Sequence, residues 1–143
     1  MDHNNILPVV LAGGKSKRFG EDKSQVKLGR KILIDYILSE LIDEFNEILI
    51  VANDPIKHLP SNKIKKIKDF KKDLGPLGGI FTAMKWAKDK NKSYKWIASF
   101  PSDTPFFKKN ILNNFLEKVN EKESELFFMT FNDKRHNIFG LWS

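Results

Sequence analysis

A glycine-rich segment with four cations, residues 11–23 (LAGGKSKRFGEDK), follows directly after the apolar run Ile6–Leu11. Paired glycines let the backbone come close to a ligand, and successive N–H groups can then point at phosphate oxygens. The positive side chains that would supply the opposite charge are Lys15, Lys17, Arg18 and Lys23. This combination predicts a phosphate-binding loop at the carboxyl end of a buried strand.

The segment matches neither of the two common phosphate-binding motifs. The first glycine of a Walker A loop would fall on Val9, and the dinucleotide fingerprint would need a glycine at Lys15. A solvated lysine-rich turn is the competing structural interpretation. Such a turn has no need for paired glycines, spaced cations and a preceding buried strand together, so we favour ligand binding.

A second segment combines Asp69 with the glycine-rich residues 75–79 (GPLGG), between an expected strand and an expected helix. Glycines at a helix start permit the close approach of a planar or anionic group. Turn formation by Gly75 and Pro76 is the structural alternative, and the two roles can share one loop. Asp69 alone is ambiguous, because a carboxylate at a strand end is often a turn or helix cap.

A third segment, residues 101–106 (PSDTPF), places Asp103 between two prolines after a short apolar run. Mg²⁺ prefers one or two carboxylates together with phosphate oxygens and water, so Asp103 is a candidate metal ligand. An Asx turn is an equal alternative on this segment alone. The cationic glycine loop in the same chain favours the metal, because a metal and several cations are typical of reactions at a nucleotide phosphate.

Apolar periodicity predicts the elements that would position these segments. The expected strands are residues 6–11, 47–52, 64–68, 96–100, 126–131 and one that starts at 139; the expected helices are residues 32–45, one from about 77, and 111–119. Strands that alternate with helices need crossover connections, so we expect an α/β fold, Rossmann-like, with three α/β/α layers and a mainly parallel sheet. Ligands bind beyond the carboxyl ends of such strands, where residues 12–23, 52–54 and 101–105 fall.

Composition narrows the class of protein. The 143 residues are 41% apolar and contain no cysteine, which indicates a single domain with a real core and excludes thiolate catalysis. The net charge of +7 is spread along the chain without a nucleic-acid-binding motif, so we expect no nucleic-acid partner but a small anionic ligand. No apolar stretch is long enough for a membrane span and no signal peptide is apparent, so we expect a cytoplasmic protein with no membrane partner.

Taken together, the motifs resemble the molybdenum cofactor guanylyltransferases, which join GMP to molybdopterin. The first motif alone fits the wider group of nucleotidyltransferases, whereas the full set is more specific. The motifs occur in the family's order over nearly the whole chain. They are residues 11–20 with Asp22-Lys23, Ala52-Asn53, Asp69, residues 75–80, residues 101–106, and Arg135-His136 leading to residues 139–142.

The resemblance implies a fold of the nucleotide-diphospho-sugar transferase type and the transfer of GMP from GTP to the terminal phosphate of molybdopterin. The molybdopterin phosphate would attack the α-phosphorus in line, and pyrophosphate would leave. Mg²⁺ is the implied metal, with Mn²⁺ as an alternative. Molybdoenzyme-maturation proteins are implied partners, and the chain would be a monomer or a weak homo-oligomer.

The same resemblance implies roles for residues in the matching motifs. Arg18 and Lys23 would hold the triphosphate, and Asp103 would bind the metal and the nucleotide; these three form the implied catalytic set. Arg135 and His136 would lie on the acceptor side. Backbone groups of the first loop would contact the base, ribose and phosphates, while an asparagine and an aspartate would fix the guanosine. The implied GTP-binding residues are Leu11, Ala12, Gly13, Gly14, Lys23, Asn53, Asp69, Gly78 and Asp103.

Two alternatives stay open. The chain ends just past residues 139–142, where the family normally continues, so we expect one nucleotidyltransferase domain over residues 1–143 without the C-terminal portion typical of the family. A related nucleotidyltransferase that uses CTP, or a phosphorylated sugar or alcohol as acceptor, is one alternative. A non-catalytic nucleotide-binding fragment is the other.

Overall fold

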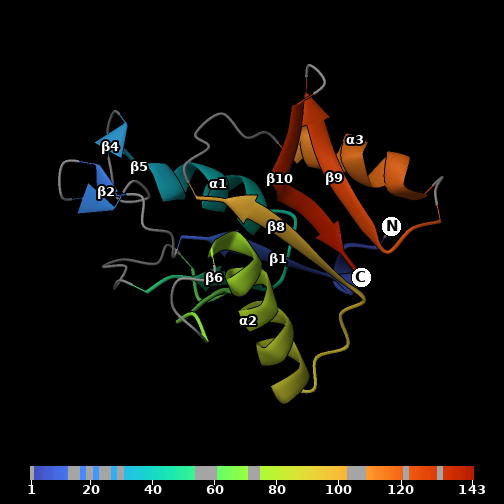
Figure 1. The fold of residues 1–143 in the computed structure, drawn as a ribbon, viewed down its shortest axis with the longest axis horizontal. Coiled ribbons are helices and arrows are strands. Elements are labelled where there is room, and N and C mark those ends of the chain that lie inside the picture. The colour runs from blue at the N-terminus through green and yellow to red at the C-terminus, as the bar shows by residue number, and fades with distance from the viewer. Residues whose placement is uncertain are drawn as a thin grey trace.

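The computed structural model describes residues 2–12, 17–18, 21–22, 27–28, 31–53, 61–70, 75–102, 109–120, 123–131 and 134–143 (Figure 1). Three helices and a central sheet dominate this part of the chain. In chain order the elements are the 3₁₀-helix His3–Asn5, β1 Ile6–Leu11, β2 Lys17–Arg18, β3 Glu21–Asp22, β4 Lys27–Leu28, β5 Lys31–Ile32, α1 Leu33–Ile42, β6 Ile48–Val51, β7 Ile64–Ile67, α2 Gly75–Asp89, β8 Trp96–Pro101, α3 Lys109–Asn120, β9 Leu126–Phe131 and β10 Lys134–Trp142.

The central sheet has six strands in the order β7-β6-β1-β8-β10-β9. The first four strands in this order are parallel to one another, and β10 runs antiparallel to both of its neighbours. Parallel neighbours need crossover connections, which α1 and α2 provide. The expectation of a mainly parallel sheet in an α/β fold is therefore confirmed.

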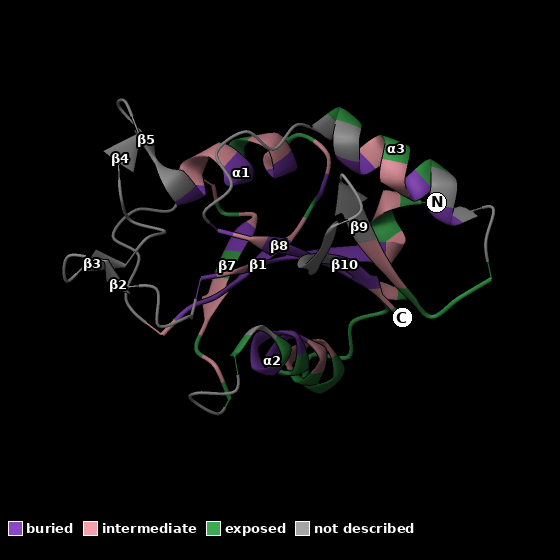
Figure 2. Ribbon diagram, turned by 45° about the horizontal axis from the view of Figure 1, so that its top comes forward, coloured by how far each residue is buried: buried purple, intermediate pink, exposed green. Residues whose placement is uncertain are grey.

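The helices cover the sheet in two layers. Figure 2 shows α1 and α3 on one face of the sheet and α2 on the other, which confirms the expected three-layer arrangement. The side chains of Ile34, Ile37, Leu38 and Leu41 follow the helical repeat and are fully buried on the first face. On the second face α2 packs against β1, β6 and β8, with Ala83 buried at the contact.

The lysine-rich strand β7 lies at one edge of the sheet, where Lys65 is exposed and Ile64 is buried. Lysine on an edge strand opposes pairing with another chain. The basic residues near 63–68 therefore fit an exposed edge strand. Within the described part of the chain, no helix combines the length and apolar content that a membrane crossing requires.

Among the element boundaries that differ from the sequence-based expectation, those of α2 and β10 bear on the site. Helix α2 begins at Gly75, so the expected loop of residues 75–79 forms the first turn of this helix. Proline suits this place, because its fixed φ is helical and its missing N–H would have no partner there. Strand β10 begins at Lys134 rather than at Phe139, with a register irregularity between His136 and Gly140. Such a bulge interrupts the alternation by which a strand is recognised in a sequence.

Candidate active site

The carboxyl ends of four parallel strands lie side by side along one edge of the sheet. Leu11, at the end of β1, pairs with Val51 of β6 on one side and with Pro101 of β8 on the other. The Ala12 N–H donates to the Val51 carbonyl at 2.9 Å, which extends this pairing by one residue. The strand ends that precede residues 12–23, 52–54 and 101–105 therefore meet, as the sequence predicts.

Helix α2 begins at the same edge and comes unusually close to β1. A Cβ placed on Gly79 would lie 2.7 Å from Leu11 Cδ2 and 3.7 Å from Asp69 Oδ1. Real Cβ atoms essentially never come within 3.0 Å of another atom, so any larger residue at position 79 would force Leu11 to move. Gly79 thus allows the first turn of α2 to contact both the end of β1 and Asp69.

The hydroxyl of Thr82 joins the chain after β7 to this first helical turn. Thr82 Oγ accepts a hydrogen bond from the Phe70 N–H at 2.9 Å and donates to the Gly78 carbonyl at 2.9 Å. The Thr82 residue is only 5% exposed. Because Phe70 follows Asp69 directly, this pair of bonds fixes the backbone next to the carboxylate.

Asp69 has the chemistry of a ligand-binding group. Its Oδ1 atom is buried and finds no hydrogen-bond donor among the described residues. Burial raises the pKa of the Asp69 carboxyl, and hydrogen bonding with Thr82 lowers it in part. A buried acceptor without a donor costs free energy, so its presence calls for an explanation, and an N–H or O–H group of a ligand would satisfy it.

Comparison with known proteins decides the family. A family model described as a MobA-like NTP transferase domain matches residues 8–143. The chain belongs to this family. It is 33% identical to a molybdenum cofactor guanylyltransferase of Haemophilus influenzae over 96% of this chain and 70% of the relative. It is 31% identical to a probable molybdenum cofactor guanylyltransferase of Halalkalibacterium halodurans, over 99% of this chain and 72% of that relative.

Solved structures agree on the fold of this MobA-like domain. Molybdopterin-guanine dinucleotide biosynthesis protein A of Archaeoglobus fulgidus matches with a TM-score of 0.71 at 19% identity, over 96% of this chain and 67% of that one. The 2-C-methyl-D-erythritol 4-phosphate cytidylyltransferase of Francisella tularensis matches with a TM-score of 0.66 at 16% identity, over 92% and 64%. A Mycobacterium tuberculosis protein solved as a complex with manganese matches with a TM-score of 0.68 at 13% identity, over 97% and 70%.

Five of the sequence-predicted nucleotide residues in this MobA-like domain lie at or just after a strand end, or in the first turn of α2, at the described edge. These are Leu11, Ala12, Asn53, Asp69 and Gly78. Four others lie outside the described residues: Gly13, Gly14, Lys23 and Asp103. The roles of all nine stay predictions.

For three predicted residues, which lie in strands, the structure describes the backbone but not the side chain. Arg18 lies in β2, where its backbone pairs with Glu21 of β3 in a small hairpin outside the main sheet. Arg135 and His136 lie near the start of β10. Because β10 runs antiparallel to β8, its start points toward the same edge as the carboxyl end of β8. This direction is consistent with an acceptor-side role for Arg135 and His136.

Sequence reasoning missed Gly79 and Thr82 as residues of this edge. Gly79 belongs to the GPLGG motif, but the sequence does not tell which of its glycines faces Leu11. The structure shows that it is Gly79. Thr82 carries no sequence signal, since a threonine inside a helix usually has no special role. Its contact with Phe70 joins residues from two different elements.

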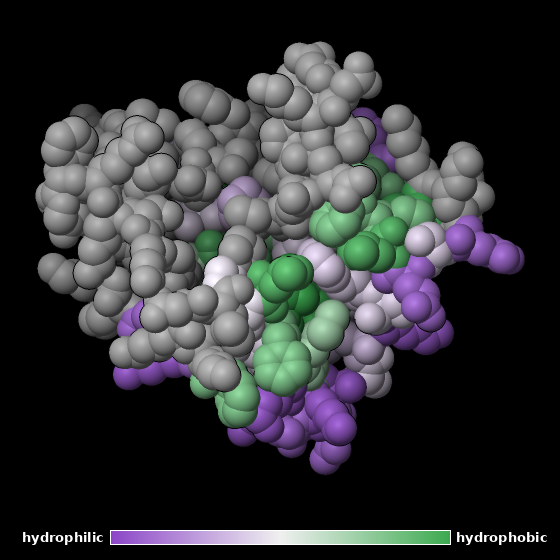
Figure 3. All heavy atoms as spheres, viewed as in Figure 1, coloured by the Kyte–Doolittle hydropathy of each residue, from purple (hydrophilic) through white to green (hydrophobic). Residues whose placement is uncertain are grey.

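An apolar surface borders the candidate site of the MobA-like domain. Phe70 and Phe81 meet edge to face at 5.9 Å between ring centroids, and both are more than half exposed. Leu77 is 65% exposed one helical turn before Phe81, and Lys85 Nζ lies 5.4 Å from the Phe70 ring centroid. Figure 3 shows apolar residues gathered over α2 on the near face, with hydrophilic residues beside them.

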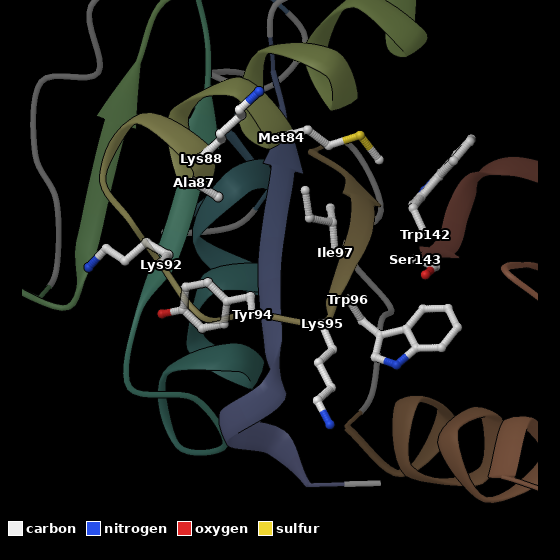
Figure 4. A pocket seen from close by; sticks show the side chains of 10 residues that line it. All are labelled: Met84, Ala87, Lys88, Lys92, Tyr94, Lys95, Trp96, Ile97, Trp142 and Ser143. Carbon is white, nitrogen blue, oxygen red and sulfur yellow. The ribbon is translucent and has the colours of Figure 1, made fainter.

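A hollow of about 320 Å³ lies at the other end of the sheet, where β8 begins and β10 ends (Figure 4). Met84, Tyr94, Trp96 and Trp142 contribute to its lining. Ligands of open α/β sheets bind beyond the carboxyl ends of the strands, so this hollow is at the wrong end for the nucleotide.

Across the described residues, no group of three or more acidic, histidine or cysteine side chains forms a metal site.

Proposed function

We propose that this protein transfers GMP from GTP to the terminal phosphate of molybdopterin. One observation carries the proposal. At the carboxyl edge of the parallel strands, the first turn of α2 lies next to both Leu11 and Asp69. The 33% identity to a named molybdenum cofactor guanylyltransferase supports the choice of substrates. An oxygen of the molybdopterin phosphate forms a bond to the α-phosphorus of GTP, the bond from that phosphorus to the bridging oxygen breaks, and pyrophosphate leaves.

The described residues of the edge would hold the nucleoside half of GTP. Among the described residues Asp69 Oδ1 has no donor, so it can accept a hydrogen bond from an N–H or O–H group. Asn53 follows the end of β6, the strand next to β7. The Ala12 N–H is already bonded to the Val51 carbonyl. We therefore assign the phosphate-directed N–H groups to Gly13 and Gly14, whose lack of a side chain permits close approach.

The triphosphate and the metal would be held by the charged residues that sequence analysis identifies. Arg18 and Lys23 would neutralise the phosphates. Asp103 directly follows Ser102 at the end of β8, and a single carboxylate there fits Mg²⁺ or Mn²⁺, which take phosphate oxygens and water as their other ligands. A bound metal would supply positive charge next to the phosphates. No protein nucleophile is needed, so the chain would mainly position the reactants and stabilise charge.

Nucleotide-dependent thermal stability is the first test. A ligand that binds only the folded state raises the melting temperature, so Tm is measured with GTP, CTP, UTP and ATP, each with and without Mg²⁺. We expect the largest shift with GTP, and a further increase with Mg²⁺. A larger shift with CTP would contradict the guanylyl assignment and favour the cytidylyl alternative.

The chain spans 72% and 70% of the lengths of the two relatives named above, so binding and turnover are tested separately. Pyrophosphate release is measured with GTP, Mg²⁺ and molybdopterin. Release that requires all three supports the transfer reaction. GTP binding without release under these conditions would instead support the non-catalytic alternative, a protein that binds the nucleotide without transferring it.

A further inference from the structure

We propose that Thr82 is a positioning residue that holds Asp69 in the geometry needed to bind the nucleotide. The inference rests on the proposed function, because it takes Asp69 as a contact to the guanosine. Thr82 itself is not expected to touch substrate. It would act through its hydroxyl, which links the end of β7 to the first turn of α2.

The hydroxyl of Thr82 is the meeting point of three groups. It accepts from the Phe70 N–H and donates to the Gly78 carbonyl, both at 2.9 Å. The Asp69 carboxylate lies close enough to this hydroxyl for Thr82 to lower its pKa in part. A hydroxyl has one hydrogen and two lone pairs, so Thr82 can donate to the Gly78 carbonyl and accept from the Phe70 N–H at the same time.

This arrangement fixes Asp69 from two directions. The bond to the Phe70 N–H anchors the backbone one residue after Asp69, and Gly79 leaves space for the carboxylate against α2. Thr82 is buried, so water does not readily replace its hydroxyl if the hydroxyl is lost. The Phe70 N–H and the Gly78 carbonyl would then each lose a partner, and the chain around Asp69 would relax.

Such relaxation would matter for binding because, within the described part of the chain, Asp69 Oδ1 has no hydrogen-bond donor. A buried acceptor left without a partner favours any movement that brings it to water. Thr82 opposes that movement by holding the adjoining backbone. The unmatched oxygen therefore stays available for a hydrogen-bond donor of the ligand.

The test is a double-mutant cycle on GTP affinity with Thr82→Val, Asp69→Asn and the double variant, in the full chain. Valine keeps the shape and burial of threonine but removes the hydroxyl. We expect Thr82→Val to weaken GTP binding about fivefold, the effect of one hydrogen bond. In the Asp69→Asn background the same change should weaken binding less than twofold, since coupled residues are not additive. Thr82→Ser, which keeps the hydroxyl, should bind GTP within about twofold of the wild type.

A matched control separates positioning from general stability. Ser99→Ala also removes a buried, hydrogen-bonded hydroxyl, but at the contact between β8 and Trp142. It should lower the melting temperature while leaving the GTP dissociation constant unchanged. If Thr82→Val binds GTP as the wild type does, or weakens binding equally with and without Asp69→Asn, Thr82 does not act through Asp69.

Titration of the wild type with GTP and with CTP separates a failure of this inference from a failure of the proposed function. If the wild type binds CTP in preference to GTP, the proposed function fails, and the same cycle with CTP still tests Thr82. If GTP binds and only Thr82→Val has no effect, the inference alone fails. If the folded wild type binds no nucleotide, both are overturned.

Discussion

Gly79 lies so close to Leu11 that a Cβ at position 79 would be 2.7 Å from Leu11 Cδ2. Leu11 ends β1, and Gly79 belongs to the first turn of α2, so the contact sets the distance between the central strand and the helix that covers it. The same contact brings the helix start against Asp69. The proposed nucleotide site depends on this distance.

Gly79→Ala should therefore impair the site. The new methyl group forces the Leu11 side chain to move. Overpacking costs about 1–3 kcal/mol, and we expect the lower end of this range because Leu11 Cδ2 is the end of a flexible side chain. We expect a lower melting temperature and weaker GTP binding. Leu11→Ala offers a rescue, because it removes the clashing methyl group. If Gly79→Ala costs as much in the Leu11→Ala background as in the wild type, the close contact is not the cause.

Asp69→Asn should stabilise the protein at neutral pH while it weakens nucleotide binding. Burial raises the pKa of Asp69 above the ordinary value of 3.8, so the folded state binds this proton to higher pH than the unfolded chain does. The free energy of unfolding therefore falls as pH rises through the raised pKa, and the charged form is a cost at neutral pH. The amide removes that cost at nearly constant shape.

Melting curves of the wild type and Asp69→Asn across a pH series test whether the charged Asp69 carboxylate lowers the stability of the fold. The advantage of the variant should be largest at neutral pH and should shrink as the pH approaches 3.8, where Asp69 becomes protonated in both states. A variant that is less stable than the wild type at neutral pH would contradict the account of Asp69 as a group retained for binding. Isothermal titration with GTP measures the expected loss of affinity.

Asp103→Ala should remove catalysis with little effect on stability. Loss of a group that stabilises transition-state charge typically costs about a hundredfold or more in rate. Replacement of a loop carboxylate usually alters stability by only about 0.5 kcal/mol, and we expect the same of Asp103→Ala. Pyrophosphate release and thermal melting measure the two effects. Asp89→Ala, at the exposed end of α2, is the control for the loss of an acidic residue. Equal rates for Asp103→Ala and the control would exclude Asp103 as the metal ligand.

Ser99→Ala should destabilise the fold and leave nucleotide binding unchanged. Ser99 Oγ accepts from Trp142 Nε1 at 2.8 Å, which ties the end of β10 to β8 away from the nucleotide edge. Loss of this partner leaves the indole N–H unpaired and should cost about 1 kcal/mol. Chemical denaturation measures the loss. An unchanged midpoint would show that the indole finds another partner.

Much of the fold could be predicted from the sequence because the pattern was local. The strands Ile6–Leu11 and Leu126–Phe131 have the expected bounds, and Ile34, Ile37 and Leu41 lie on the buried face of α1 as their spacing predicts. The start of α2 was placed too late, because glycine and proline indicate a turn. Pro76 instead occupies the first helical turn, where its geometry is favourable.

The candidate site was predictable only in part, since its residues meet through packing between elements. The strand ends converge because parallel neighbours end at the same edge, and that follows from fold class. The approach of Gly79 to Leu11 depends on how close α2 lies to β1, and no sequence pattern gives that distance. The hydrogen bond from Phe70 to Thr82 likewise exists only once β7 and α2 are packed together.

The transfer of the α-phosphate is the most direct measurement of the central proposal. The protein is incubated with Mg²⁺, molybdopterin and GTP labelled either at the α-phosphorus or at the γ-phosphorus. We predict that the α-label appears in a molybdopterin dinucleotide and the γ-label in pyrophosphate. Transfer from CTP at a higher kcat/KM than from GTP, or no transfer by a folded protein that binds GTP, would contradict the account.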